Sequence, residues 1–167
     1  HKKASALRFG ASDVIDKSNQ PLWPTAAALT PTGFDLVCDA NGAETLKQSY
    51  LHLKPAGKLV TYGFHTMLPK SSGRPNWLKL AIDYLRTPRF DPLEMTTQSR
   101  SVLAFNLSYL FDRTDILLEA MSRLLAWLSE GQIMPLETTC VPFEHAGEAH
   151  RALASGQTTG KLVLSVE

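Results

Sequence analysis

Two short apolar runs, separated by a helical segment and a turn, constrain this chain more than any other feature. Residues 34–38 and 58–61 are nearly continuous apolar runs, as expected for strands of a parallel sheet that is covered by helices on both faces. The residues between them predict a helix at 43–53, which the signal Lys54-Pro55-Ala56-Gly57 ends. The sequence therefore predicts a βαβ unit and an α/β fold with a doubly wound parallel sheet.

The carboxyl ends of these strands are the expected binding edge, because ligands of such sheets bind there. The two ends read Asp39-Ala40-Asn41-Gly42 and Tyr62-Gly63-Phe64, and glycine lets a backbone approach a ligand closely. A plainer interpretation stays open for both ends. Asp39 and Asn41 could serve only to cap the next helix, and Gly63-Phe64 could be an ordinary turn.

The composition is that of a globular chain about one domain long. Of the 167 residues, 44% are hydrophobic and 20% charged, and the net charge is +1, which excludes a disordered tail and a strong field for nucleic acid. No apolar stretch approaches the ~20 residues that span a bilayer, and the charged start is not typical of a secretory signal. We expect a cytoplasmic protein with no nucleic-acid partner and no transmembrane segment.

The cysteines and histidines show no metal-binding or redox pattern. Cys38 and Cys140 form no CxxC pair and no zinc-ligand spacing, so each is predicted to be a small buried hydrophobe. His52, His145 and His150 lie on predicted helices without a partner at metal spacing. We expect packed or solvent-facing histidines and no metal site.

Further helices and strands are expected around the βαβ unit. The predicted helices are 3–8, one within 20–32, 76–85, 115–130 and 144–155, and the predicted strands are 11–16, 101–107, 136–142 and 161–166. A polar loop at 69–75 and the helix after it are interpreted as an insertion. The apolar stripes around Trp77 and Trp127 are predicted to belong to the core.

One part of a complete dinucleotide site does not occur in these residues. Such a site holds the pyrophosphate on backbone N–H groups of a glycine-rich loop at a helix N-terminus, and the 167 residues contain no such loop. We therefore expect a fragment that is inactive alone. A methyltransferase domain often has a similar strand and turn, so residues 34–60 by themselves leave that class open.

Read from end to end, the chain resembles the C-terminal half of the medium-chain dehydrogenase/reductase superfamily (zinc-binding alcohol dehydrogenase-like), in its quinone oxidoreductase branch. The resemblance rests on residues 2–16, on the βαβ unit, and on the ending from Pro142-Phe143-Glu144 to Gly160-Lys161-Leu162. Methyltransferases lack that ending, which makes them a remote alternative. The insertion and residues 99–110 resemble the vesicle amine transport protein group within the branch.

The resemblance implies an NADPH-dependent reductase that transfers hydride to a quinone, an enone or a similar carbonyl, without zinc. It implies that residues 1–131 are the C-terminal part of an incomplete Rossmann-type domain. Residues 132–167 would return to the GroES-like catalytic domain, whose main part would lie upstream with the glycine-rich loop. A second class stays open, in which a reductase-like module binds protein, lipid or a membrane surface without catalysis.

The resemblance also implies roles for individual residues, although it indicates no catalytic residue and no particular substrate. Lys2 matches a lysine that pairs with the 2′-phosphate of the cofactor. The cofactor-binding residues implied at the strand ends are Asn41, Gly42, Gly63, Phe64, Phe105, Asn106 and Leu107. The strand at 101–107 would pair with its twin in a homodimer. The loop 155–160 has no arginine where the branch often places one, which argues against a cofactor contact from that loop.

Overall fold

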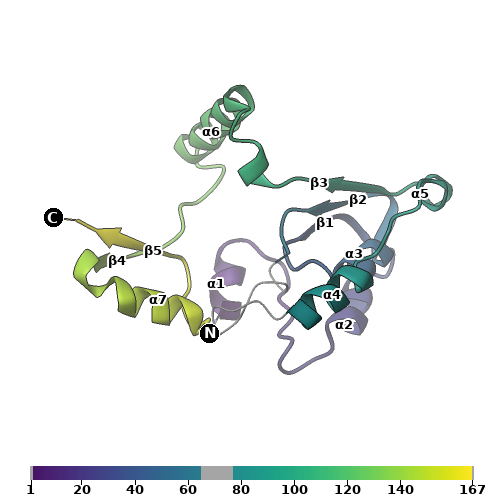
Figure 1. Cartoon of the computed structure of the whole chain (residues 1–167), viewed down its shortest axis with the longest axis horizontal. Coiled ribbons are helices and arrows are strands. Elements are labelled where there is room, and N and C mark those ends of the chain that lie inside the picture. Colours follow the sequence, from purple (N-terminus) through teal and green to yellow (C-terminus); the bar gives the residue numbers. More distant parts are fainter. Residues whose placement is uncertain (1, 65–76, 167) are drawn as a thin grey trace. The chain divides into compact units, whose positions relative to one another are not determined.

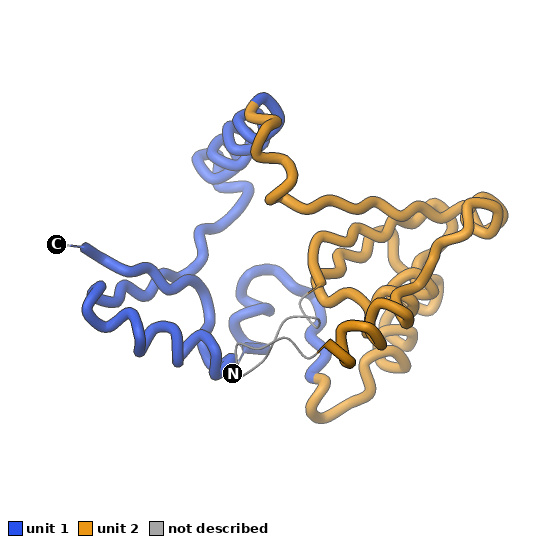
Figure 2. The backbone as a smooth tube through the Cα atoms, viewed as in Figure 1, with its two compact units in different colours: residues 1–16, 115–167 blue, residues 17–114 orange. Residues whose placement is uncertain are grey.

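The computed structural model describes residues 2–64 and 77–166 (Figure 1). The chain divides into two compact units, one of Lys17–Thr114 and one of His1–Asp16 with Asp115–Glu167 (Figure 2). The long helix that begins at Thr114 therefore groups with the C-terminal residues. The domain boundary expected between residues 131 and 132 stays a prediction.

A three-stranded parallel sheet is the centre of the Lys17–Thr114 unit. Its strands, in spatial order, are β1 (Phe34–Asp39), β2 (Leu53–Thr61) and β3 (Ser101–Ala104). Helix α3 (Leu46–Leu51) makes the crossover between β1 and β2. In the register, Cys38 lies opposite Val60, and Val60 lies opposite Leu103. The predicted βαβ unit and the α/β class are confirmed.

Strand β2 begins earlier than predicted, and α3 is shorter. Phe34 pairs with Leu53 and Leu36 pairs with Lys58, so the register shifts across the segment that the sequence marked as a stop signal. In that segment Ala56 takes a positive φ of 64° and donates its N–H to the carbonyl of Ser99 over 2.6 Å. The proline and glycine do bend the chain there, but pairing with β1 continues on both sides of the bend.

One face of the sheet carries the core. Helix α3 packs on this face, where the buried cluster consists of Leu46, Tyr50, Leu53 and Leu59. Alternate strand residues turn to the other face, where Leu36 is 54% exposed and Leu103 51%. Within the described residues of this unit, the buried cluster lies on the α3 face of an incomplete Rossmann-type sheet.

The remaining elements follow the predicted order with a few differences. They are α1 (Lys2–Arg8), α2 (Leu22–Leu29), α4 (Trp77–Arg86), α5 (Pro92–Gln98), η2 (Leu107–Tyr109), α6 (Thr114–Ser129), β4 (Thr138–Pro142), η3 (Phe143–His145), α7 (Ala146–Ala154) and β5 (Lys161–Ser165). The strand predicted at 11–16 is wrong, because that segment pairs with no strand in the described part of the chain. The predicted strand 101–107 ends at Ala104. The loop predicted at 69–75 lies outside the described residues.

Helix α5 was not predicted, although the sequence carries its signal. The carboxylate of Asp91 accepts a hydrogen bond of 2.8 Å from the N–H of Leu93, and Pro92 occupies the first turn. An Asp followed by Pro is a favoured helix start. In the other unit, β4 and β5 pair in parallel, and α7 connects them.

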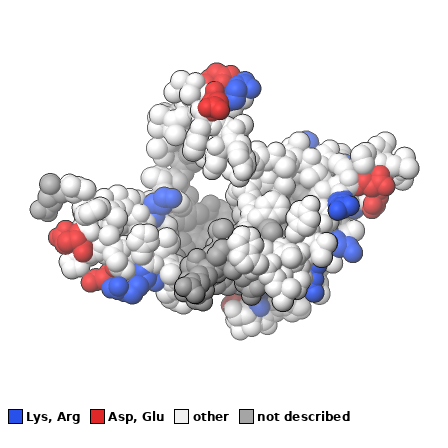
Figure 3. Space-filling view, viewed as in Figure 1, with Lys and Arg blue, Asp and Glu red and all other residues white. Residues whose placement is uncertain are grey.

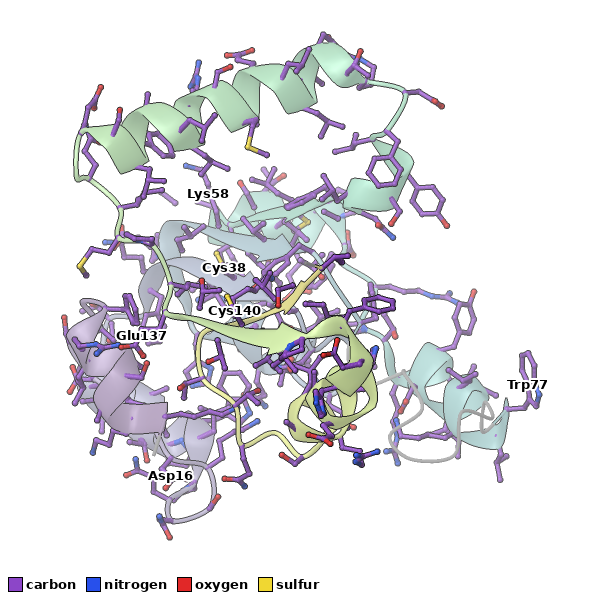
Figure 4. The ribbon with its side chains drawn as sticks, turned by 90° about the vertical axis from the view of Figure 1, so that its left-hand side faces the viewer. Asp16, Cys38, Lys58, Trp77, Glu137 and Cys140 are labelled. Atoms are coloured by element: carbon purple, nitrogen blue, oxygen red, sulfur yellow. The ribbon has the colours of Figure 1, made fainter. Side chains whose placement is uncertain are left out.

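Three predictions of burial are wrong. Trp77 is 76% exposed, and its side chain points away from the ribbon (Figure 4). Helix α6, which carries Trp127, has no buried residue. Cys38 and Cys140 are both exposed. In each case the apolar pattern gave the correct element, but burial depends on a neighbour that covers the face, and the described residues supply none there.

Candidate functional site

The carboxyl ends of all three strands of the sheet meet at one pocket. Its volume is about 620 Å³, and its lining consists of Ala40, Thr61, Tyr62, Gly63, Phe64, Ala104, Phe105 and Asn106. Every lining residue ends one of the strands or closely follows it. This is the edge at which open parallel sheets bind their ligands.

Two glycines let the ends of β1 and β2 approach each other closely. A Cβ added to Gly42, whose φ is +90°, would lie 2.4 Å from Cδ1 of Phe64. A Cβ added to Gly63 would lie 3.0 Å from the carbonyl oxygen of Ala40. Protein atoms therefore fill the space beside both glycines. Gly42 shapes the pocket because the Phe64 ring packs directly against it.

Asp39, the last residue of β1, fixes the turn that follows. Its Oδ1 accepts hydrogen bonds from the N–H of Asn41 at 2.8 Å and the N–H of Gly42 at 3.1 Å. Oδ1 also accepts from the Thr45 hydroxyl at 2.9 Å, and Oδ2 accepts from the Ser49 hydroxyl at 2.7 Å. These bonds tie the strand end to the start of α3, so the Asp39 carboxylate serves the turn and the helix.

The environment of Asp39 keeps its carboxylate charged. Burial by itself raises the pKa of this nearly inaccessible group. The hydrogen bonds from Ser49, Thr45, Gly42 and Asn41 act in the opposite direction and prevail, so the pKa of Asp39 lies below its ordinary value of 3.8. The turn is consequently held by an ionised group at neutral pH.

The pocket wall combines aromatic surface with one unused polar atom. The rings of Tyr62 and Phe105 stack with their centroids 6.2 Å apart and their planes 16° apart. The Thr61 hydroxyl is buried and has no hydrogen-bond partner among the described residues. The side chain of Asn106 is engaged, because its Oδ1 accepts from the N–H of Ser108 at 3.0 Å. The stacked rings suit a flat ligand, while the Thr61 side chain points to the buried face of the strand.

The structure brings together four of the eight predicted cofactor residues at this pocket. Its lining includes Gly63, Phe64, Phe105 and Asn106. Asn41 and Gly42 form the adjoining turn on the Asp39 carboxylate. Leu107 begins the helix η2 just after the pocket, and the exposed Lys2 belongs to the other compact unit. The cofactor roles of all eight residues stay predictions.

Sequence reasoning missed the residues that end the strands rather than follow them. Thr61 ends β2 and Ala104 ends β3, and both line the pocket, whereas the predicted site residues lie one or more positions further along the chain. The two-residue period of the strands could have found them, because side chains alternate between the two faces of a strand as far as its last paired residue.

The histidines of the predicted helices have structural partners or lie at the surface. Nδ1 of His52 lies 2.8 Å from the carbonyl oxygen of Gln48, and its ring packs 5.0 Å from that of Trp23. Nδ1 of His145 lies 3.2 Å from a carboxylate oxygen of Glu148. Within the described residues, no three His, Cys, Asp or Glu side chains are grouped so that they could hold a metal ion.

The order of the elements and the pocket at the strand ends agree with a known family. The profile of the family described as "Zinc-binding dehydrogenase" matches residues 9–164. The chain belongs to this family. Within it, the relatives place the chain in the medium-chain dehydrogenase/reductase superfamily, on its quinone oxidoreductase branch. The methyltransferase alternative is thereby set aside.

The curated relatives are longer than this chain. The human "Synaptic vesicle membrane protein VAT-1 homolog" is 30% identical over 155 residues, which cover 93% of this chain and 39% of that protein. The zebrafish (Danio rerio) protein of the same name is 27% identical over 158 residues, which cover 95% of this chain and 32% of that protein. The chain thus spans about a third of the length of these relatives.

Solved structures share the fold. The quinone oxidoreductase of Thermus thermophilus, described together with its complex with NADPH, matches with a TM-score of 0.65 and 26% identity. The match covers 95% of this chain and 44% of that one. As to membranes, none of the helices within the described ranges has the length and apolar character needed to span a bilayer.

Proposed function

We propose that this chain is part of an oxidoreductase that uses NADPH to reduce a quinone, an enone or a similar carbonyl compound. The observation that carries the proposal is the pocket at the carboxyl ends of β1, β2 and β3 in a chain of the zinc-binding dehydrogenase family. The relative described with NADPH supports the choice of cofactor. The cofactor would supply the hydride, and the protein would position it.

The residues present fit the nicotinamide end of such a cofactor. The Thr61 hydroxyl is buried without a partner among the described residues, at the end of β2 beside the pocket. A rotation of this side chain on ligand binding would bring the hydroxyl to the carboxamide or the ribose. The stacked Tyr62 and Phe105 rings would give a flat apolar surface beside the nicotinamide. The backbone at Gly63 and Phe64 would close the same side.

The pyrophosphate end of the cofactor has no counterpart in these residues. The chain has no glycine-rich loop of the kind that holds a pyrophosphate at a helix N-terminus. We therefore expect the 167 residues by themselves to bind NADPH weakly and to reduce no quinone. The test uses both this chain and the longest protein that the gene encodes, with NADPH consumption followed in the presence of a quinone and an enone.

Replacing Thr61 with Val tests the pocket itself. The substitution keeps the shape and removes the unpartnered hydroxyl, so the affinity for NADPH should fall about fivefold, the value of one neutral hydrogen bond. Stability should stay the same or rise, because an unsatisfied buried group is removed. Titration of NADPH fluorescence in the encoded protein and thermal unfolding measure the two effects.

Thr138→Val is the matched control, since Thr138 is exposed on β4 and lies outside the pocket lining. Equal NADPH affinity in the Thr61→Val and Thr138→Val variants would show that the Thr61 hydroxyl does not contact the cofactor. Failure of the encoded protein to bind NADPH at all would refute the reductase proposal.

The names of the relatives support a second candidate, a reductase-like module that binds without catalysis. The curated relatives are described as vesicle membrane proteins. Under this alternative, the encoded protein would associate with vesicles or a protein partner even when its NADPH pocket is empty. Flotation of the encoded protein with liposomes, compared with and without NADPH, would distinguish this role from a catalytic one.

A further inference from the structure

A second pocket of the Lys17–Thr114 unit shares no lining residue with the pocket at the strand ends. Its volume is about 460 Å³, and it lies between α3 and the segment that connects α4 to α5. The lining includes the cations Lys47, Arg86 and Arg89 and the apolar surfaces of Tyr50, Leu85 and Phe90. Three positive charges beside an apolar wall are not needed to build the fold.

The three cations have no counter-ion in the described structure. No ion pair joins Lys47, Arg86 or Arg89 to an acidic residue within 2–64 and 77–166. All three side chains belong to exposed residues, and Figure 3 shows Lys and Arg side chains on the side of the molecule where α3 and α5 lie. Their charges are therefore available to a ligand.

The two carboxylates of the pocket are already engaged in local hydrogen bonds. Oδ1 of Asp91 accepts from the N–H of Leu93 at 2.8 Å and so caps α5. Oε1 of Glu94 accepts from the side-chain amide of Gln98 at 2.8 Å. Both carboxylates remain charged, so the three cations and two carboxylates of the lining leave the pocket with a formal net charge of +1.

Tyr50 lines this pocket and carries a buried, unused hydrogen-bond donor next to it. Its side chain is 5% exposed and packs on the Phe90 ring, with 5.1 Å between the ring centroids. Its hydroxyl is buried without a hydrogen-bond partner among the described residues, a condition that native structures rarely tolerate. Burial and the nearby Glu94 raise the pKa of Tyr50, so the hydroxyl stays protonated and can donate.

We propose that this pocket binds a small amphipathic organic anion. The carboxylate or phosphate group of the ligand pairs with Lys47, Arg86 and Arg89, and an oxygen of that group accepts from the Tyr50 hydroxyl. Its apolar part lies against Leu85 and Phe90. Arginine suits such a group because its planar fork matches carboxylate and phosphate geometry.

The probes are octanoate and phenyl phosphate, with octanol and phenol as their uncharged counterparts. Backbone amide signals of the 167-residue chain are followed by NMR during titration. We expect the two anions to shift the signals of residues 47–51 and 85–94, and the uncharged probes to leave them in place. Comparison of octanoate with octyl phosphate, which has an apolar chain of similar length, identifies the head group as carboxylate or phosphate. Absence of any shift with millimolar octanoate and phenyl phosphate would overturn the proposal.

Two variants test the assigned residues. The double variant Arg86→Gln/Arg89→Gln should bind the preferred anion about tenfold more weakly, because two charge-assisted contacts are lost. Tyr50→Phe should keep its fold, since no protein hydrogen bond is removed, and should also bind more weakly. Arg123→Gln on α6 is the matched control and should bind like the unchanged chain. Undiminished binding by the double arginine variant, with the β1 signals unchanged, would refute the site.

Discussion

At the scale of single residues, Asp39 organises the binding edge without belonging to its surface. Its carboxylate is 3% exposed and accepts from two backbone N–H groups and two hydroxyls. The sequence left open whether this acid contacts a ligand or caps the following turn. Both roles use the same residue type, so only the structure could decide, and it shows the capping contacts.

Replacing Asp39 with Ala should destabilise the chain by about 2–4 kcal/mol, because it leaves two N–H groups and two hydroxyls without their acceptor. The measurement is the free energy of unfolding in urea at pH 7. Asp35→Ala is a matched control on the same strand, because the Asp35 side chain is 81% exposed and pairs with Lys54 at the surface. A loss for Asp39→Ala no larger than that for Asp35→Ala would contradict the role given to Asp39.

The contribution of Asp39 should depend on pH in a defined direction. Because the pKa of Asp39 is lower in the folded state than its ordinary value of 3.8, its stabilisation is fully present above that value. It is lost as the pH falls through the lower, folded-state pKa. The gap in unfolding free energy between the unchanged chain and Asp39→Ala should therefore be constant from pH 7 to pH 5 and should narrow below 3.8. A gap that widens on acidification would contradict the assignment.

Gly42 should tolerate no side chain, for two separable reasons. A Cβ there would lie 2.4 Å from Cδ1 of Phe64, and φ is +90°. Gly42→Ala should cost about 2–3 kcal/mol, of which about 1 is conformational. Gly131→Ala is the control for the conformational part, since Gly131 has a φ of +70° and open space around it. The losses in unfolding free energy of the two variants, measured in urea, should differ by the steric part. Equal losses would contradict the close contact between residue 42 and Phe64.

At the scale of elements, sequence reasoning succeeded where a local pattern determines the structure. The apolar runs gave β1, β2 and β5, and helical spacing with a final glycine gave α6. Half of the residues that line the pocket were predicted as cofactor-binding residues, because they follow the carboxyl ends of the strands. In each case a short stretch of sequence holds the whole signal.

The failures share a different cause, since they depend on what lies against an element. Residues 11–16 have the apolar character of a strand, but a strand needs a partner to pair with, and the described residues provide none. The burial of Cys38 and Trp77 likewise depends on a covering neighbour. A single sequence pattern carries no information on that neighbour.

The outer edge of β3 permits a test of the proposed homodimer. The N–H of Phe105 donates to the carbonyl of Thr61 on β2, so the N–H of Ala104 points to the opposite edge, which pairs with no strand among the described residues. Ala104→Pro should therefore abolish pairing with a second copy of β3 without breaking the β2 ladder. Sedimentation velocity should show a dimer for the unchanged protein and a monomer for the variant.

Ala104→Val keeps the N–H and is the control, so it should remain dimeric. A dimer that persists in Ala104→Pro would show that β3 does not form the contact. Circular dichroism of each variant would establish that the fold is retained.

At the scale of the whole molecule, the buried residues are concentrated in one unit. Among the described residues, all of them except Ala149 belong to Lys17–Thr114. Helix α6, by contrast, extends over Thr114–Ser129 and has no buried residue. Because stability within a protein follows buried contact, the two units should differ in their resistance to local opening.

Hydrogen exchange followed by mass spectrometry measures this difference. Peptides from α3 and β2 should exchange slowest, because these elements supply the buried cluster of Leu46, Tyr50, Leu53 and Leu59. Peptides from α6 should exchange at least about tenfold faster, which corresponds to a difference of about 1.4 kcal/mol in opening free energy. The internal reference is α7, which buries Ala149 and should be intermediate. Equal protection of α6 and β2 would contradict this distribution.

The bend in β2 and the short α3 also bear on how the chain acquires its structure. Strand β1, helix α3 and strand β2 follow one another directly within residues 34–61, so their mutual contacts join residues that are close in sequence. Closing such short loops costs little chain entropy and is fast. We expect this segment to assemble before β3 has been synthesised, and then to act as the template on which β3 docks.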